Sequence, residues 1–214
     1  MPSSIIHLCI AKEVAKQIKV NKEEFLYGNI LPDQAIVKSY KEKDKLHFYK
    51  KVTIDNITKE NVDLEEFLSV HQKDLNDSVS LGIYSHFITD HLWIKNFIIK
   101  HLINIDGKIY LKTKRGNLRN NRITVYIDYD KMNEWLIEKY DISCEFIKTV
   151  KYNGNFKEIY NLPKEKIYEK ENGFIQNTRK GEMDIFSKEE VEGFIKKTAI
   201  EVVKKIKDLE IKGV

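Results

Sequence analysis

Residues that interrupt helices are scarce in this sequence: its 214 residues include three prolines and nine glycines. Proline breaks the interior of a helix and glycine weakens it, so this scarcity leaves long segments that can be helical. Lysine, glutamate, isoleucine and leucine fill much of those segments, and hydrophobic residues make up 42% of the chain. The sequence therefore predicts an all-α fold with enough apolar side chains for a buried core.

Capping residues and apolar spacing give the expected boundaries of the helices. Asn21 precedes one apolar segment, which ends at Pro32 because the residue ahead of a proline disfavours helical geometry. Ser187 and Glu190 form a capping-box pattern ahead of the last segment. Helices are expected from Ser3 or Ser4 to Val20, from Lys22 to Leu31, from Leu64 to Lys73, from Asn76 or Asp77 to Leu102, from Tyr129 to Tyr140 and from Ser187 to Leu209.

Three other segments have less regular patterns. Residues 45–54 fit a strand as well as a helix. Residues 108–113 and 122–127 fit either a loop or two short strands of a hairpin around Gly116 and Asn117. Residues 153–181 are polar, and we expect them to be irregular. No low-complexity linker divides the chain, so residues 1–214 are expected to form a single domain.

Charge and cysteine content exclude several classes of protein. The formal net charge is +4 with both signs mixed, so nothing in the composition requires a nucleic-acid partner. Cys9 and Cys144 are too few for a disulfide scaffold. No stretch approaches the roughly 18 apolar residues of a membrane span. The first residues lack the pattern of a secretion signal, so the expected location is the cytoplasm.

The most informative polar pair is His86 and Asp90, four residues apart within one expected helix. Side chains at this spacing project side by side. Their neighbours on that helix face are apolar, and a buried carboxylate is costly unless it is paired or bound to a metal. The two residues are therefore ligands of one metal ion, or a hydrogen-bonded pair, or Asp90 pairs with a lysine.

The other polar residues of interest are ambiguous when each is taken alone. His7 lies on the apolar face of the first expected helix, which is typical of a buried core histidine. Asp33 follows Pro32 and fits a turn or a helix cap. His47 alternates with apolar neighbours, which is typical of a surface histidine on a strand. All six histidines lie within the first 101 residues, so a histidine-based site belongs to the first half of the chain.

Taken in order, these motifs resemble the zinc-dependent phospholipase C family. Gly28-Asn29-Ile30-Leu31-Pro32-Asp33 is similar to the family's G-x-x-x-P-D sequence. Residues 81–93 resemble its L-G-Y-x-x-H-x-x-x-D-x-x-W helix, with Ile83 in place of the tyrosine. The opening seven residues, Lys45-Leu46-His47-Phe48 and residues 126–133 resemble further family segments, so the resemblance covers most of the chain.

This resemblance implies an all-α phospholipase C-like bundle with at most one small β-hairpin. Residues 1–104 would form the metal-site half of its single domain, and residues 105–214 would cover it. By the same match, one zinc ion would be held by Asp33, His47, His86 and Asp90. His7 and Asp90 would hold a second zinc ion, with Asp90 as the bridge. Asp33 would also serve as the base that activates the attacking water.

The sequence departs from the family in two places. Secreted members bind a third metal with an additional histidine and a later His-x-x-x-Glu motif, but the corresponding position here is near Asn96 and no histidine follows His101. We therefore expect the third site to be absent or rebuilt. Secreted members also use their first residue as a ligand. Removal of Met1 ahead of Pro2 would expose an amine five residues before His7, as a partial replacement for that ligand.

Three functions are consistent with these observations. The first is a metal-dependent hydrolase of phosphoesters, acting on a phospholipid, a nucleotide or another small phosphodiester. The second is a catalytically inactive, metal-stabilised binding module of the same fold. The third is a helical adaptor that binds a partner through its basic C-terminal helix. Imidazole and carboxylate ligands suit zinc, iron and manganese alike, and the sequence does not indicate an oligomeric state.

Overall fold

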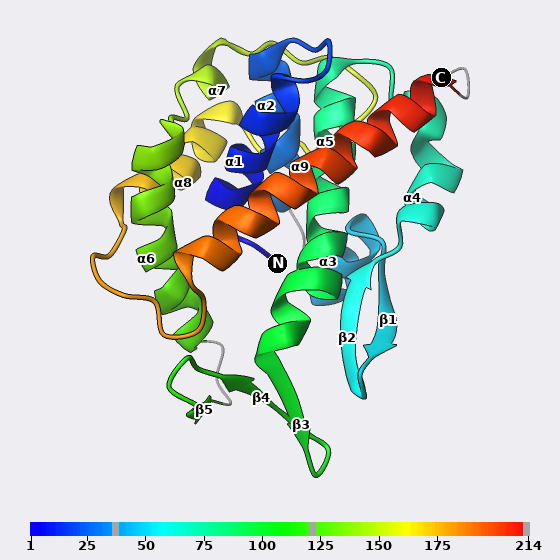
Figure 1. The fold of residues 1–214 in the computed structure, drawn as a ribbon. Coiled ribbons are helices and arrows are strands. Elements are labelled where there is room, and N and C mark those ends of the chain that lie inside the picture. The colour runs from blue at the N-terminus through cyan, green and yellow to red at the C-terminus, as the bar shows by residue number, and fades with distance from the viewer. Residues whose placement is uncertain (36–38, 120–122, 212–214) are drawn as a thin grey trace.

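The computed structural model describes residues 1–35, 39–119 and 123–211 as a mainly helical domain with two small sheets (Figure 1). The α-helices are α1 (Ser4–Ala15), α2 (Lys22–Ile30), α3 (Tyr40–Leu46), α4 (Leu64–His71), α5 (Ser78–Leu92), α6 (Ile123–Tyr140), α7 (Phe146–Thr149), α8 (Lys164–Gln176) and α9 (Lys188–Ile211). Short 3-10 helices are η1 (Leu31–Gln34), η2 (Gln72–Asp74) and η4 (Ile98–His101), and η3 (Trp93–Phe97) is a single π-helical turn. The strands are β1 (Tyr49–Ile54), β2 (Ile57–Val62), β3 (Leu102–Ile105), β4 (Lys108–Lys112) and β5 (Leu118–Arg119).

Helix α5 occupies the centre of the domain and packs against α1, α2 and α9 (Figure 1). Asp77 caps it by accepting a hydrogen bond from the Ser80 N–H at 2.7 Å, and the Ser80 hydroxyl in turn accepts one from the Asp77 N–H. Both cap groups that were expected from the sequence at α2 and α9 are also present, in Asn21 and in the Ser187–Glu190 box. The caps therefore fix where the core helices start.

The two sheets exceed the single hairpin that the sequence suggested. Strands β1 and β2 form an antiparallel hairpin, so the ambiguous residues 45–54 divide into the end of α3 and a strand. Strand β4 pairs with both β3 and β5, and Gly116 turns the chain between β4 and β5 with φ +80°. A turn around Gly116 was correctly expected, but the returning strand is only two residues long.

Residues 122–127 were expected to form either a loop or the second strand of that hairpin, and both alternatives were wrong for residues 123–127. They form the beginning of α6, and residue 122 lies outside the described residues. The β-branched run Ile123-Thr124-Val125 favours a strand locally. However, Tyr129, Met132 and Leu136 continue an apolar face at helical spacing, and this face is buried in the core. Packing of that face outweighs the local preference.

Residues 153–181 were expected to be irregular. This is correct for residues 153–163 and 177–181 but wrong for residues 164–176, which form α8. This helix starts directly after Pro163, a residue whose fixed φ suits a helix start. Its apolar face is narrow, with Ile167 fully buried and most other positions polar. None of the helices in the described ranges is both long enough and apolar enough to cross a bilayer.

Candidate metal centre

The candidate centre is built where α2 and α5 touch. Gly28 and Gly82 allow this contact, since a Cβ added to Gly82 would lie 2.3 Å from the Phe25 carbonyl oxygen. Close approach brings the backbone of Asn29 beside His86, whose Nδ1–H donates a 2.8 Å hydrogen bond to the Asn29 carbonyl oxygen. A carbonyl can only accept, so this bond fixes the proton on Nδ1. The Nε2 lone pair of neutral His86 is then available to a metal ion.

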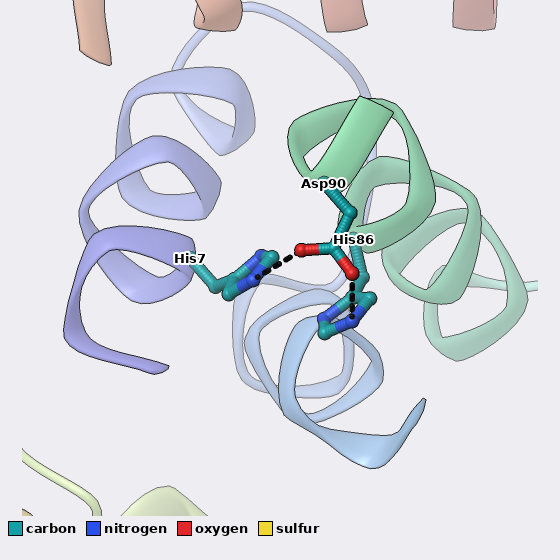
Figure 2. Close-up of side chains that lie close together, drawn as sticks. All are labelled: His7, His86 and Asp90. Carbon is teal, nitrogen blue, oxygen red and sulfur yellow. Dashed lines mark ion pairs between the residues drawn. The ribbon is translucent and has the colours of Figure 1, made fainter. Parts of the chain in front are cut away.

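Asp90 lies between two histidines, and each of its oxygens faces a different ring (Figure 2). Its Oδ1 is 3.3 Å from Nε2 of His7, and its Oδ2 is 3.4 Å from Nε2 of His86. The two imidazoles stack with their centroids 4.0 Å apart. The side chains of His7 and His86 are 0% exposed and that of Asp90 is 2% exposed. The first helix therefore contributes a buried polar ring directly opposite the His86–Asp90 pair.

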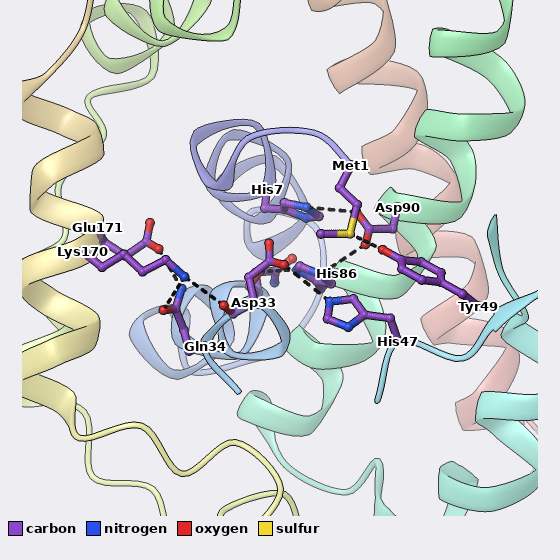
Figure 3. A network of polar contacts seen from close by, with 11 residues as sticks. Met1, His7, Asp33, Gln34, His47, Tyr49, His86, Asp90, Lys170 and Glu171 are labelled. Carbon is purple, nitrogen blue, oxygen red and sulfur yellow. Dashed lines mark hydrogen bonds and ion pairs between the residues drawn. The ribbon is translucent and has the colours of Figure 1, made fainter. Parts of the chain in front are cut away.

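Asp33 and His47 complete the cluster from two other segments. Asp33 is in η1, and His47 lies between α3 and β1. Their closest approach is 3.4 Å, between Asp33 Oδ1 and His47 Nε2. His47 is 1% exposed, which excludes the surface-histidine interpretation. The structure thus brings all five residues singled out from the sequence into one neighbourhood, in two groups that share His86 (Figure 3).

The separations within this cluster fit metal ligands better than hydrogen bonds. Atoms bound at ~2.0–2.1 Å to one tetrahedral zinc lie about 3.3 Å apart, close to the separations given above. Within the described part of the chain, His7 Nε2, His86 Nε2 and both Asp90 oxygens are buried and have no hydrogen-bond partner. Buried polar atoms of this kind are normally satisfied. A divalent cation would satisfy all of them, so the donor set fits one or two metal ions.

Electrostatics keep the carboxylates of this cluster ionised. Burial alone would raise the pKa of Asp90, but the adjacent His86 and His7 hold it well below its usual range. Burial likewise opposes ionisation of Asp33, and His47 and His86 still lower its pKa. The pKa of His7 is lowered, mainly by burial and by the neighbouring His86. Burial opposes protonation of His86, but Asp90 raises its pKa, so a metal ion that binds Nε2 would displace a proton there.

The sequence did not point to a further network on α8 that reaches η1 (Figure 3). Gln34 Nε2 donates a 2.8 Å hydrogen bond to Glu171, while Lys170 Nζ donates one of 2.9 Å to the Asp33 carbonyl oxygen. Glu171 is 1% exposed. Glu171 follows Ile167 by four residues, so the two share one face of a helix, and this spacing was the signal in the sequence that Glu171 is buried. The segment is otherwise so polar that no helix was expected there.

Asn96 and the N-terminus mark the two places where the sequence departs from the secreted members of the family. Asn96 is exposed and lies on the side of the helix that faces α9, away from the cluster. Met1 lies beside the cluster (Figure 3), where its carbonyl oxygen accepts a 2.7 Å hydrogen bond from the Tyr129 hydroxyl. Its sulfur contacts the Tyr49 hydroxyl. A ligand role for an N-terminal amine stays a prediction.

Comparison with known proteins gives one match. The family model described as zinc dependent phospholipase C matches residues 6–208, a range that includes all five candidate ligands. Neither a curated protein nor a solved structure matches the chain.

Proposed function

Because the chain belongs to the zinc-dependent phospholipase C family, we propose that it hydrolyses a phosphodiester at the cluster on α1, η1 and α5. Asp33, His47, His86 and Asp90 would hold one zinc ion, and His7 and Asp90 a second. The observation that carries this proposal is the position of Asp90, whose two oxygens face two different histidines. A carboxylate in that arrangement is suited to bridge two ions.

When bound, zinc lowers the pKa of a coordinated water toward ~7 and neutralises charge on phosphoryl oxygens. The protein's own contribution is the base that removes the proton from that water. Asp33 is the best candidate, since its side chain is 17% exposed whereas that of Asp90 is 2% exposed. Its lowered pKa keeps it ionised near neutrality. A carboxylate of such low basicity needs the metal-lowered pKa of the water to take up its proton.

The family match favours a phospholipid as the substrate. Water would attack phosphorus, the ester bond to the lipid alcohol would break, and that alcohol would leave with a proton. The Asn29 carbonyl oxygen has a separate, orienting role, because its hydrogen bond holds the His86 ring in place and fixes its tautomer. Lys170 and Glu171 of α8 would hold η1, and with it Asp33, in place.

Metal content measured on untagged protein tests the ligand set. We expect one or two zinc ions per chain, and loss of zinc in His86→Ala and Asp90→Ala. His91→Ala is the matched control, because His91 lies on the same helix but bonds the Val62 carbonyl oxygen instead. Zinc content unchanged by His86→Ala and Asp90→Ala would refute the assignment.

Activity is tested separately with phosphatidylcholine and with a soluble phosphodiester. Asp33→Asn keeps the shape of the side chain but cannot accept a proton. We expect it to lower kcat on both substrates by ~100-fold or more, the usual contribution of a general base. Retention of full activity by Asp33→Asn would exclude it as the base.

The second candidate function is a metal-stabilised binding module without catalysis. It is favoured by the position of Asn96 away from the cluster and by the lack of histidine after residue 101. Chelation would then lower the melting temperature, while the zinc-loaded protein would turn over neither substrate.

A further inference from the structure

The outer face of the β3–β4–β5 sheet has an unusual composition. Directly opposite residues in an antiparallel pair point to the same side of a sheet, and alternate residues along a strand share that side. Ile103 is opposite Tyr110, Ile105 is opposite Lys108, and Lys112 is opposite Leu118. These six residues therefore form one surface, which we call the outer sheet face.

This face is turned away from the core. Leu111 lies on the other side of the sheet and is buried. On the outer sheet face, Ile103, Ile105 and Leu118 are 39%, 38% and 41% exposed. The solvated side of an antiparallel sheet is normally polar. Three aliphatic side chains together on that side therefore need a partner to explain them.

The charge around this face is concentrated and of one sign. Residues 102–119 contain one acid, Asp106, and the following bases: Lys108, Lys112, Lys114, Arg115 and Arg119. Five bases and one acid give this segment a net charge of +4, equal to the formal net charge of the whole chain. Over the described ranges, none of these five bases forms an ion pair. The rest of the molecule is balanced, so this sheet carries the entire excess of positive charge.

The start of α6 extends the apolar surface. The sheet and the first turns of α6 lie at the same end of the molecule (Figure 1). Ile123 and Tyr126, in those turns, are more than half exposed. A tyrosine and several aliphatic side chains surrounded by lysines and arginines are typical of surfaces that lie in the headgroup region of a bilayer.

We infer that the outer sheet face docks onto an anionic lipid surface. The aliphatic side chains would enter the headgroup boundary, and Lys108 and Lys112 would extend their ammonium groups to lipid phosphates. Charge decides between this partner and a second copy of the chain, since two copies of the segment 102–119, each of net charge +4, would repel each other. Exposed isoleucines give nucleic acid nothing to bind, so the apolar part of the face favours lipid over a polyanion.

This inference goes beyond the proposed function and does not depend on it. Docking would hold the enzyme at the surface where a phospholipid substrate resides, but the sheet contributes no residue to the metal cluster. Loss of docking should therefore leave hydrolysis of a soluble phosphodiester unchanged. Failure of the two proposals can be distinguished in this way.

Co-sedimentation of the full chain with vesicles tests the inference. We expect binding to phosphatidylcholine vesicles that contain phosphatidylserine, weak binding to phosphatidylcholine alone, and release by salt. Ile103→Ser with Ile105→Ser, and separately Lys108→Glu with Lys112→Glu, should each lower the partition coefficient by about tenfold or more. The charge variant changes only exposed side chains, so it keeps the test valid if the first variant folds poorly.

Val70→Ser and Ile200→Ser are matched controls, because both residues are exposed aliphatic residues that lie outside the sheet, on α4 and α9. They should bind vesicles like the unmodified protein. Equal loss of binding in the controls, or no binding to the anionic vesicles, would overturn the inference. So would a dimer in solution that Ile103→Ser with Ile105→Ser dissociates, because the partner would then be a second copy.

Discussion

Gly28 of α2 and Gly82 of α5 lie directly against each other, and each position has room for a hydrogen only. A Cβ on Gly28 would be 2.0 Å from the Val79 carbonyl oxygen and 2.9 Å from Cα of Gly82. The residue after Gly28 provides the carbonyl that orients His86, and His86 is one turn beyond Gly82. The packing of two glycines therefore sets the position of His86, a proposed metal ligand.

Gly82→Ala should destabilise the protein and weaken zinc binding together. The added methyl group meets backbone atoms that cannot rotate away, and overpacking of this kind costs about 1–3 kcal/mol. Separating α2 from α5 would also lengthen the hydrogen bond from His86 Nδ1–H to the Asn29 carbonyl oxygen. Urea unfolding and a zinc titration measure the two effects. Gly193→Ala is the control, since its Cβ would meet no atom within 4 Å; it should keep wild-type zinc affinity.

Removal of metal should lower the melting temperature. Buried His7, His86 and Asp90 would lose the cation that offsets their desolvation. A ligand at 100 times its Kd stabilises the folded state by about 2.7 kcal/mol. Differential scanning calorimetry with and without a chelator measures the loss. The melting temperature of His86→Ala should not respond to the chelator; a response equal to that of the unmodified protein would place the bound metal elsewhere.

Glu171 should make stability depend on pH. Burial raises its pKa to about 7, above its ordinary value of 4.5. The folded state therefore binds a proton more tightly than the unfolded state. The resulting stabilisation is complete below about pH 4.5 and is lost as pH rises to about 7. A shift of this size corresponds to about 3 kcal/mol at most.

The side chain in Glu171→Gln cannot ionise, so this variant does not lose the stabilisation that the unmodified protein loses between about pH 4.5 and 7. The unfolding free energy of the variant, relative to that of the unmodified protein, should therefore increase over this range. Above that range the difference should be constant. Urea unfolding across this pH range gives the two curves. Glu169→Gln is the control on the same helix, because Glu169 is exposed and pairs with Lys166. Parallel curves for Glu171→Gln and the unmodified protein would contradict the prediction.

Asp128 should be a strong determinant of stability, although it belongs to neither group of proposed metal ligands. Its two buried oxygens accept hydrogen bonds from the N–H groups of residues 184, 185 and 186, ahead of α9. Asp128→Ala would leave these donors without an acceptor, at a cost of about 2–4 kcal/mol in unfolding free energy. Asp130→Ala, at an exposed ion pair with Arg179, should change stability by less than about 1 kcal/mol.

The central helices could be predicted from the sequence because their signals are local. Asn21, Asp77 and Ser187 cap helices as their residue types predict. The i, i+4 spacing of His86 and Asp90 also predicted their proximity. Grouping His7, Asp33 and His47 with them needed the resemblance to a family, since the separations along the chain carry no distance information.

Long-range effects limited the remaining predictions. No signal within residues 123–127 indicates that they belong to a helix. The apolar face of α6 packs against residues that are distant in sequence, so its burial could not be read locally. Similarly, α8 is mainly polar and is held by its contacts with α6 and α7 rather than by an apolar pattern of its own. Glu171 and Lys170 were missed for that reason, although Lys170 bonds Asp33 and Glu171 bonds Gln34, the next residue of η1.

The π turn at Trp93–Phe97 follows Asp90 after only two residues. A π turn is wider than an α turn, so it shifts the rotational phase of every side chain that follows. Before the turn, Asp90 faces His7 of α1 and His86 bonds Asn29 of α2. After it, Asn96 and His101 line a separate cavity of about 400 Å³ against α9. The continuous helical segment from α5 through η4 therefore lines two separate sites, the candidate metal centre and the cavity against α9. A polar group introduced after the turn would face the α9 side and leave the proposed metal ligands His86 and Asp90 unchanged.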